Sequence, residues 1–423
     1  MDWTRLDTHK TRKTRFATLR HGLVIPAPAL VLIAGTLFSR VGDSLASLGM
    51  VLDAADHGIR WGVTEVFLAE LIPTVLAAPL VGALVDRLSA RSVCLSALAV
   101  QALSFGVAAS VDGFHLRVGL IALAGLAGVA SVTAGFKMLP VVAGGEHTGR
   151  ANGLLTAGLS TAGLIGPPLA GFLHSGRGTA FLLAADAVSF LVLAGCTALA
   201  VPRRTDVSIG RRPAAKLSDG YRALRDAPVV GMLLPTLAAA MLATSIEGVA
   251  GVFYLRDVAD GNETLFGFFL ATWALGSIPG ALLAGRAGWS TRHTALILGG
   301  VLVFSIVLLT VGLLPVAAVI FPLFLLGGFG NGVCNVGLRN AVHSQVPSEV
   351  HGSAWACYQA LSRICIGLGF VLGTPNALVS SRGQVIVSGA VPLAFSLWAL
   401  LGLGRRGQSF LGESPAGMGK VSG

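Results

Sequence analysis

Two ionisable residues of opposite charge, Arg40 and Asp43, interrupt a long apolar block near the start of the chain. Ionisable groups inside a membrane-spanning helix cost about 2.5–3.5 kcal/mol each on insertion scales, so they usually mark a functional site or a neutralised pair. A spacing of three residues places both side chains on one face of a helix. The two charges can simply neutralise each other. Equally, Asp43 can exchange a proton or bind a cation as its distance from Arg40 changes.

Three further charged residues lie inside apolar blocks. Glu70 can carry a proton in a cavity or form a hydrogen bond to a neighbouring helix. Glu247 is a second candidate for binding a proton or a cation. Arg363 has no acidic partner within its own block, so we expect it to pair across a cavity or to bind an anionic substrate. The amides Asn331 and Asn335 can donate hydrogen bonds into a cavity or between helices.

Motifs for other chemistry are absent from the sequence. It contains no GxxxxGK[ST] phosphate loop and no HExxH zinc motif, which excludes an ATPase module of its own and argues against a metalloprotease. The five cysteines are scattered through apolar blocks and are interpreted as packing residues. We therefore expect a protein that is not an enzyme and needs neither a cofactor nor a metal.

The elements that must position these residues follow from composition. The 423 residues are 54% hydrophobic and only 12% charged, about half the charged fraction of a typical soluble domain. The apolar residues form blocks of about 20 residues, long enough to cross a bilayer as helices. Twelve spans are predicted, at 27–50, 61–85, 92–111, 116–139, 151–173, 179–200, 228–254, 264–285, 295–313, 316–338, 354–376 and 384–403.

The net charge of +10 is a topology signal rather than a sign of nucleic-acid binding. With the N-terminus in the cytoplasm, most Lys and Arg residues fall on the cytoplasmic side, as the positive-inside rule expects. The outer group is Arg60, Arg117, Arg177, Arg256 and Arg382. We expect a multi-pass protein of the inner or plasma membrane with both termini in the cytoplasm.

A polar, basic interruption divides the spans into six plus six. The expected organisation is a basic N-terminus (1–26), a six-helix half (27–201), a cytoplasmic linker (202–226), a second six-helix half (227–404) and a tail (405–423). The halves are weakly similar at an offset of about 202 residues, which aligns Lys137 with Arg339 and Gly171 with Gly373.

Three stretches carry a family resemblance. The segment Gly82-Ala-Leu-Val-Asp86-Arg87-Leu-Ser-Ala-Arg91 resembles the cytoplasmic signature loop of the major facilitator superfamily. Gly163, Gly166, Pro167 and Gly171 lie in a segment that resembles the antiporter motif of its drug exporters, where proline kinks a helix and glycine allows close packing. Shorter segments between residues 31 and 372 also follow one another in an order and spacing similar to those of the macrolide-efflux and enterobactin-exporter branch of this superfamily.

The resemblance implies two six-helix halves that rock around a central cavity, with Gly82, Asp86, Arg87 and Arg91 forming a cytoplasmic gate. It also implies proton-driven export of a drug, siderophore or natural product. We therefore expect a monomer in the lipid bilayer that exchanges protons for a small molecule. The alternatives are an importer or facilitator with the same fold, and a membrane scaffold that transports nothing.

Overall fold

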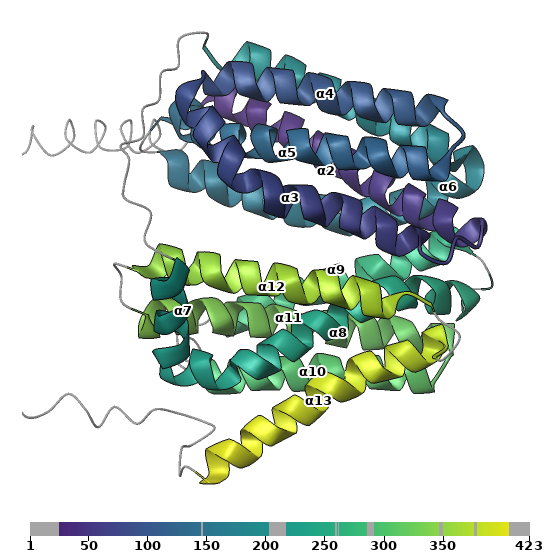
Figure 1. Cartoon of the computed structure of the whole chain (residues 1–423), viewed down its shortest axis with the longest axis vertical. Coiled ribbons are helices and arrows are strands. Elements are labelled where there is room, and N and C mark those ends of the chain that lie inside the picture. The colour runs from purple at the N-terminus through teal and green to yellow at the C-terminus, as the bar shows by residue number, and fades with distance from the viewer. Residues whose placement is uncertain are drawn as a thin grey trace, which may run out of the picture. The chain divides into compact units, whose positions relative to one another are not determined.

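The computed structural model describes residues 25–144, 147–202, 217–258, 260, 262–285, 292–346, 350–375 and 379–405. Within its helices, only the backbone is described for 78–87, 149, 217–219, 343, 351–353, 356 and 404–405. Every regular element in the described part of the chain is helical, and none is a strand (Figure 1).

The first six predicted spans lie in five helices. These are α2 (Ala27–Asp56), α3 (Gly62–Arg87), α4 (Ala90–Ser110), α5 (Phe114–Ala143) and α6 (Thr148–Ala200). Helix α6 holds two spans, because Gly178 interrupts its helical backbone with φ 71° and ψ 176°. This left-handed conformation suits glycine, which has no Cβ to clash with the backbone. Gly178 therefore separates a first segment, 148–177, from a second segment, 179–200.

The second six spans lie in six helices that follow a short connecting helix. The connecting helix is α7 (Leu217–Asp226), and the spans are α8 (Pro228–Val258), α9 (Glu263–Ala284), α10 (His293–Leu313), α11 (Ala317–Gln345), α12 (His351–Gly373) and α13 (Ser381–Arg405). The expected all-helical architecture of about twelve spans is confirmed.

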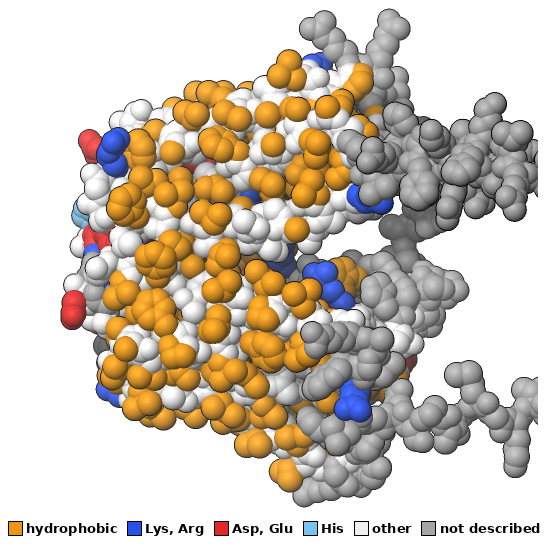
Figure 2. All heavy atoms as spheres, turned by 180° about the vertical axis from the view of Figure 1, so that it is seen from behind, with side chains coloured by type: hydrophobic (Ala, Val, Ile, Leu, Met, Phe, Trp, Pro, Cys, Tyr) orange, Lys and Arg blue, Asp and Glu red, His pale blue; other side chains and the backbone are white. Residues whose placement is uncertain are grey.

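The exposed faces of these helices are suited to lipid. Among the described residues, nine helices are long and apolar enough to cross a membrane, with α6 counted once. Large apolar side chains such as Leu103, Phe136 and Leu199 are exposed. Hydrophobic side chains cover most of the face seen in Figure 2. Soluble monomers rarely expose apolar surface on this scale, so the helices belong in a bilayer.

By internal contacts the chain forms two compact units. Unit 1 comprises residues 1–44, 76–163 and 183–209, and unit 2 comprises 45–75, 164–182 and 210–423. The boundaries cut through α2, α3 and α6, so the last part of α2, the first part of α3 and the middle of α6 belong to unit 2. The division into sequence halves, 27–201 and 227–404, stays a prediction.

Within unit 2, glycines allow α9 and α11 to pack with their backbones in contact. A Cβ added at Gly276 or Gly280 of α9 would lie 1.9 or 2.2 Å from a carbonyl oxygen of α11. Gly328 and Gly332 of α11 approach α9 backbone carbonyls in the same way. This reciprocal small-residue seam is typical of membrane helix pairs. It also explains the glycine-rich stretch around Gly330 as a packing surface.

The connecting helix α7 docks on the core of unit 2. Leu224 is buried in a cluster that includes Val230 of α8, Leu338 of α11 and Tyr358 of α12. Arg222, on the opposite face of α7, is exposed, as is Tyr221. Helix α7 is therefore amphipathic and belongs structurally with the second set of spans.

Candidate functional site

Arg40 and Asp43 form an ion pair at the middle of α2, in unit 1. The Nη1 atom of Arg40 lies 3.4 Å from Oδ2 of Asp43, and the side chains are 59% and 38% exposed. The adjacent residue Gly42 packs against Asp186 and Ser189 in the second segment of α6. The pair thus lies beside the packed face of α2, and its bond is long enough to exchange easily for another partner.

Arg363 lies on α12 at one end of a seam between α3 and α12. Its Nη1 atom donates a hydrogen bond to the hydroxyl of Thr74 on α3, at 3.0 Å. The seam continues through Leu71 against Gly367, Phe67 against Phe370 and Thr64 against Thr374. The residue numbers rise along α3 and fall along α12, so the helices are antiparallel. In this structure the partner of Arg363 on the neighbouring helix is therefore the hydroxyl of Thr74.

Glu70 and Glu247 both lie in unit 2, on α3 and α8. Glu70 is partly buried and lies one helical turn from Thr74, so it shares a face with the residue that holds Arg363. Glu247 is partly buried, and its carboxylate folds back over Gly251 of the same helix. Among the described residues it has no hydrogen-bond or ion-pair partner. Asp43 belongs to unit 1, and Glu70, Glu247 and Arg363 belong to unit 2.

The two predicted amides bond to each other along α11. Asn335 donates from Nδ2 to the backbone oxygen of Asn331 at 2.9 Å and to its side-chain oxygen at 3.0 Å. Asn335 is exposed and Asn331 is partly exposed. The pair presents one polar patch on an otherwise apolar helix.

Only one member of the predicted gate motif has a described side chain. Gly82, Asp86 and Arg87 lie in the last turns of α3, where the backbone alone is described. Arg91, on α4, donates from Nη2 to the carbonyl oxygen of Ala198 at 2.9 Å. Ala198 lies in the last turn of α6, so Arg91 satisfies a free carbonyl at a helix C-terminus.

The antiporter-like motif brings α6 into backbone contact with α9. A Cβ at Gly171 would lie 2.2 Å from the carbonyl oxygen of Glu263, and one at Gly267 would lie 2.4 Å from that of Pro167. Gly166 is buried, whereas Gly163 is exposed, and a Cβ there would meet no described atom within 4 Å. Part of the motif is therefore a contact surface between α6 and α9.

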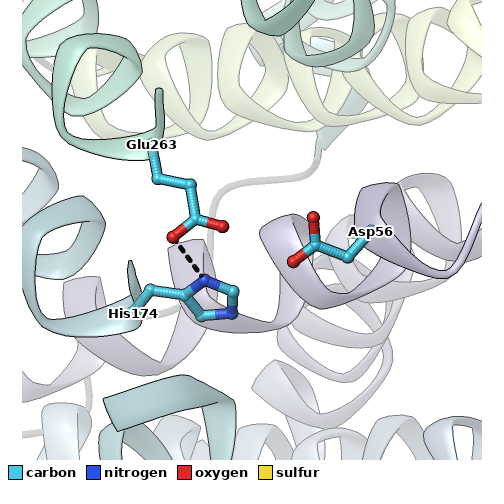
Figure 3. A group of neighbouring side chains, drawn as sticks. All are labelled: Asp56, His174 and Glu263. Atoms are coloured by element: carbon cyan, nitrogen blue, oxygen red, sulfur yellow. Dashed lines mark hydrogen bonds and ion pairs between the residues drawn. The ribbon is translucent and has the colours of Figure 1, made fainter. Parts of the chain in front are cut away.

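One turn beyond Gly171, four charged or titratable side chains meet. We call Asp56, His174, Arg256 and Glu263 the helix-end cluster, because they come from the ends of α2, the first segment of α6, α8 and α9. His174 Nδ1 lies 2.8 Å from Oε2 of Glu263, and these side chains are only 7% and 11% exposed. Figure 3 shows them pointing at each other, with Asp56 beside them.

Arg256 supplies the positive charge of the helix-end cluster. Its Nη2 atom contacts Oδ1 of Asp56 and lies 3.9 Å from Oε1 of Glu263. The donor atoms of Asp56, His174 and Glu263 lie within 4.8 Å of one another, a spacing compatible with a metal ion. Because the guanidinium already offsets one of the two carboxylate charges, we interpret the group as an ion-pair cluster. The sequence analysis did not identify it.

Other arginines of the predicted outer group also have defined contacts. Arg117 donates to the carbonyl oxygens of Ala108 and Val111 at the end of α4. Arg382 donates to the last carbonyls of α10, and Arg177 lies 5.0 Å from the ring centroid of Phe181. Arginines that cap helix C-termini satisfy carbonyls that have no partner within the helix.

With this geometry established, comparison with known proteins decides the family. Residues 32–374, most of the chain, match the Major Facilitator Superfamily. The chain belongs to the major facilitator superfamily. The resemblance expected from the sequence motifs is thus confirmed, and the chain is a multi-pass membrane transporter.

A relative within the major facilitator superfamily is the multidrug efflux pump Tap of Mycolicibacterium fortuitum. It is 25% identical over 388 residues, which cover 86% of this chain and 93% of that protein. Two similar solved structures are nucleoside transporter NupG (15% identity, 89% of this chain and 98% of that one, TM-score 0.65) and an inward-facing, unoccupied bacterial homolog of the human lysosomal transporter Spinster (12% identity, 88% and 94%, TM-score 0.65). At these identities the two structures show the shared fold alone.

Proposed function

We propose that this chain is a proton-coupled exporter of small organic molecules. The observation that carries the proposal is the Arg40–Asp43 pair, a half-exposed carboxylate held by one long ion-pair contact at the middle of a spanning helix. A carboxylate in this setting can bind a proton when its cationic partner moves away and release it when the partner returns. The similarity to a multidrug efflux pump supports the direction of transport.

In this proposal, Asp43 and Glu247 are the two proton-binding candidates. Each lies within the first spanning helix of its sequence half, α2 and α8. Glu247 has no described partner, so its protonation would break no existing ion pair. Arg363, with Glu70 one turn from its partner Thr74, provides a charged site that could bind an anionic group of the substrate.

Alternating access also needs a closure at each membrane surface. With both termini in the cytoplasm, the parts of α2, α3 and α6 that belong to unit 2 lie at the outer surface. Their contacts with α8, α9 and α12 would then close that side. We assign Gly82, Asp86, Arg87 and Arg91 to the cytoplasmic gate, and we expect a monomer in the plasma membrane.

The test begins with a resistance profile in an efflux-deficient host, which selects a transported compound. Accumulation of that compound in inside-out vesicles is then measured with and without an imposed pH gradient. We expect Asp43→Asn and Glu247→Gln to reduce gradient-driven accumulation to the level of empty vesicles. Asp226→Asn is the matched control, because Asp226 is an exposed acid at the end of α7, outside the spans.

Three results would contradict the proposal. Full gradient-driven transport by the variant that carries both substitutions would remove Asp43 and Glu247 from the coupling. Counterflow of labelled compound without any effect of the pH gradient would favour a facilitator. Failure of any compound in the panel to be transported would favour the non-transporting alternative.

A further inference from the structure

We propose that His174 and Glu263 form a proton-operated latch, which holds α6 against α9 while it carries one bound proton and releases α9 when that proton leaves. The latch is distinct from the coupling residues Asp43 and Glu247. It rests on the proposed function only in assuming that the transporter alternates between two states.

The hydrogen bonds around the imidazole can accommodate an extra proton. Nδ1 of His174 faces the Glu263 carboxylate at 2.8 Å, and an ionised carboxylate can only accept a hydrogen bond. Nε2 faces the hydroxyl of Thr179 at 3.0 Å, and that hydroxyl also lies 3.4 Å from the carbonyl oxygen of Gly49. When the hydroxyl donates to Gly49, both ring nitrogens face acceptors, which a doubly protonated ring satisfies. A proton placed on Glu263 and donated to a neutral ring gives the same total.

The charges around the imidazole favour one extra bound proton. The charged and titratable groups that face the imidazole are Asp56 from α2, Arg256 from α8 and Glu263 from α9. With a neutral ring the helix-end cluster carries two negative charges and one positive charge. With the ring protonated, the cluster is neutral. Glu263 and His174 are nearly excluded from water, and an unbalanced charge in such a place is costly.

The latch joins segments that are far apart in the sequence. Asp56 and His174 come from the first six spans, whereas Arg256 and Glu263 come from the second six. The backbone contact of Gly171 with Glu263 brings α6 close enough for His174 to reach across. Separation of α6 from α9 would break the histidine–glutamate bond, and the separated groups would return to water. Release of the proton would accompany that separation.

The expected pH dependence follows from this geometry. Only the closed arrangement holds the ring nearly buried against the Glu263 carboxylate, where a positive charge on the ring is balanced, so protonation favours closure. The closed fraction should be highest at low pH and should fall as the pH rises. For one linked proton, the ratio of closed to open molecules changes by at most about tenfold per pH unit.

Pulsed electron spin resonance between two labels can measure this equilibrium directly. Ser175 on α6 and Phe268 on α9 are exposed, so each can carry a label as cysteine, and the pair reports the separation of these two helices. The five native cysteines are first replaced, and retained transport confirms that the background folds. In nanodiscs without substrate or a pH gradient, we expect the short-distance population to decrease from pH 5 to pH 8.

His174→Gln retains an amide that can bond to Glu263 but cannot gain a proton, so its distance distribution should not change with pH. Glu263→Ala, which removes the carboxylate, should lose the short-distance population even at pH 5. His57→Gln is the matched control: among the described residues, the side chain of His57 pairs with Asp53, four residues earlier, at 3.5 Å, and the variant should behave like wild type.

The latch is overturned if the wild-type distances do not change with pH, or if His174→Gln retains the wild-type pH response. Because these distances are measured without transport, they separate the latch from the proposed function. A pH-dependent closure in a protein whose vesicles ignore the pH gradient would support the latch and refute proton-coupled export. Gradient-driven transport with pH-independent distances would do the reverse.

Discussion

The two ends of the antiporter-like motif, Gly163 and Gly171, differ in what a methyl group would meet, and this difference gives a matched pair of substitutions. At Gly171 a Cβ would lie 2.2 Å from the carbonyl oxygen of Glu263, whereas ordinary contacts lie at 3.4–4 Å. The Cβ would thus lie 1.2 Å closer than the 3.4 Å limit of an ordinary contact, and the backbone carbonyl of Glu263 would have to move to restore that distance. At Gly163 a Cβ would meet no described atom within 4 Å.

The expected effects therefore have opposite signs. Gly171→Ala overpacks a helix contact, which typically costs about 1–3 kcal/mol. Gly163→Ala removes a flexible residue from a helix interior, which stabilises by about 0.5–1 kcal/mol. The stability of the two variants should thus differ by about 1.5–4 kcal/mol. If the cost at Gly171 falls on the contact of α6 with α9 alone, the closed state is disfavoured by about 5–150-fold, at 1.4 kcal/mol per tenfold.

Two measurements test this pair. Thermal unfolding of the purified variants at one fixed scan rate should place Gly171→Ala below wild type and Gly163→Ala at or slightly above it. The label distances between positions 175 and 268 should lengthen in Gly171→Ala at low pH and stay unchanged in Gly163→Ala. Equal effects of the two substitutions on both measurements would refute the argument that Gly171 is a backbone contact point.

Three further substitutions test other contacts. Arg363→Gln retains a donor for Thr74 but removes the charge, so uptake of anionic compounds into inside-out vesicles should fall while the unfolding midpoint stays close to that of wild type. Gly276→Ala should lower the unfolding midpoint through a cost of about 1–3 kcal/mol, because its Cβ would lie 1.9 Å from a backbone oxygen of α11, whereas Gly299→Ala, which meets no described atom within 4 Å, should not. Arg382→Met leaves two carbonyls at the end of α10 without their donors, and the unfolding midpoint should fall through a loss of about 1–3 kcal/mol.

The spans could be predicted from the sequence because every span must cross the same bilayer, which requires about 20 mostly apolar residues each time. The predicted break between spans five and six, after 173 and before 179, contains Gly178, where the backbone leaves the helical region. The alignment of Gly171 with Gly373 also has a structural counterpart. Each is a close backbone contact, with Glu263 in one case and with Ile246 in the other.

The helix-end cluster could not be found by the same reasoning. Its members come from four helices, and each lies at a span end, where a charged residue needs no special explanation. A search for charged residues inside apolar blocks therefore passes over them. Two features of the sequence could have pointed to it. The outer ends of the predicted spans carry few charges, and His174 follows the Gly-Pro-Pro motif by only a few residues.

The sequence predicts that Arg363 pairs across a cavity or binds an anionic substrate, but local patterns cannot identify a partner. The antiparallel seam of α3 and α12 pairs Thr74 with Arg363, ten residues along α3 from the contact of Thr64 with Thr374. Such a register depends on which small and aromatic residues face each other. It is set by packing between distant segments and is invisible to local periodicity.

Close packing and titratable chemistry are connected at the contact of α6 with α9. Small residues on both helices, Gly171 and Gly267, allow the two backbones to touch, and only that approach lets His174 reach Glu263. A substitution that separates the helices should then alter the proton response without changing either titrating residue. Conversely, loss of the proton should weaken a contact that is otherwise entirely steric. The antiporter-like motif would thus act through the distance it permits between helices, and the charged residues would determine when that distance is kept.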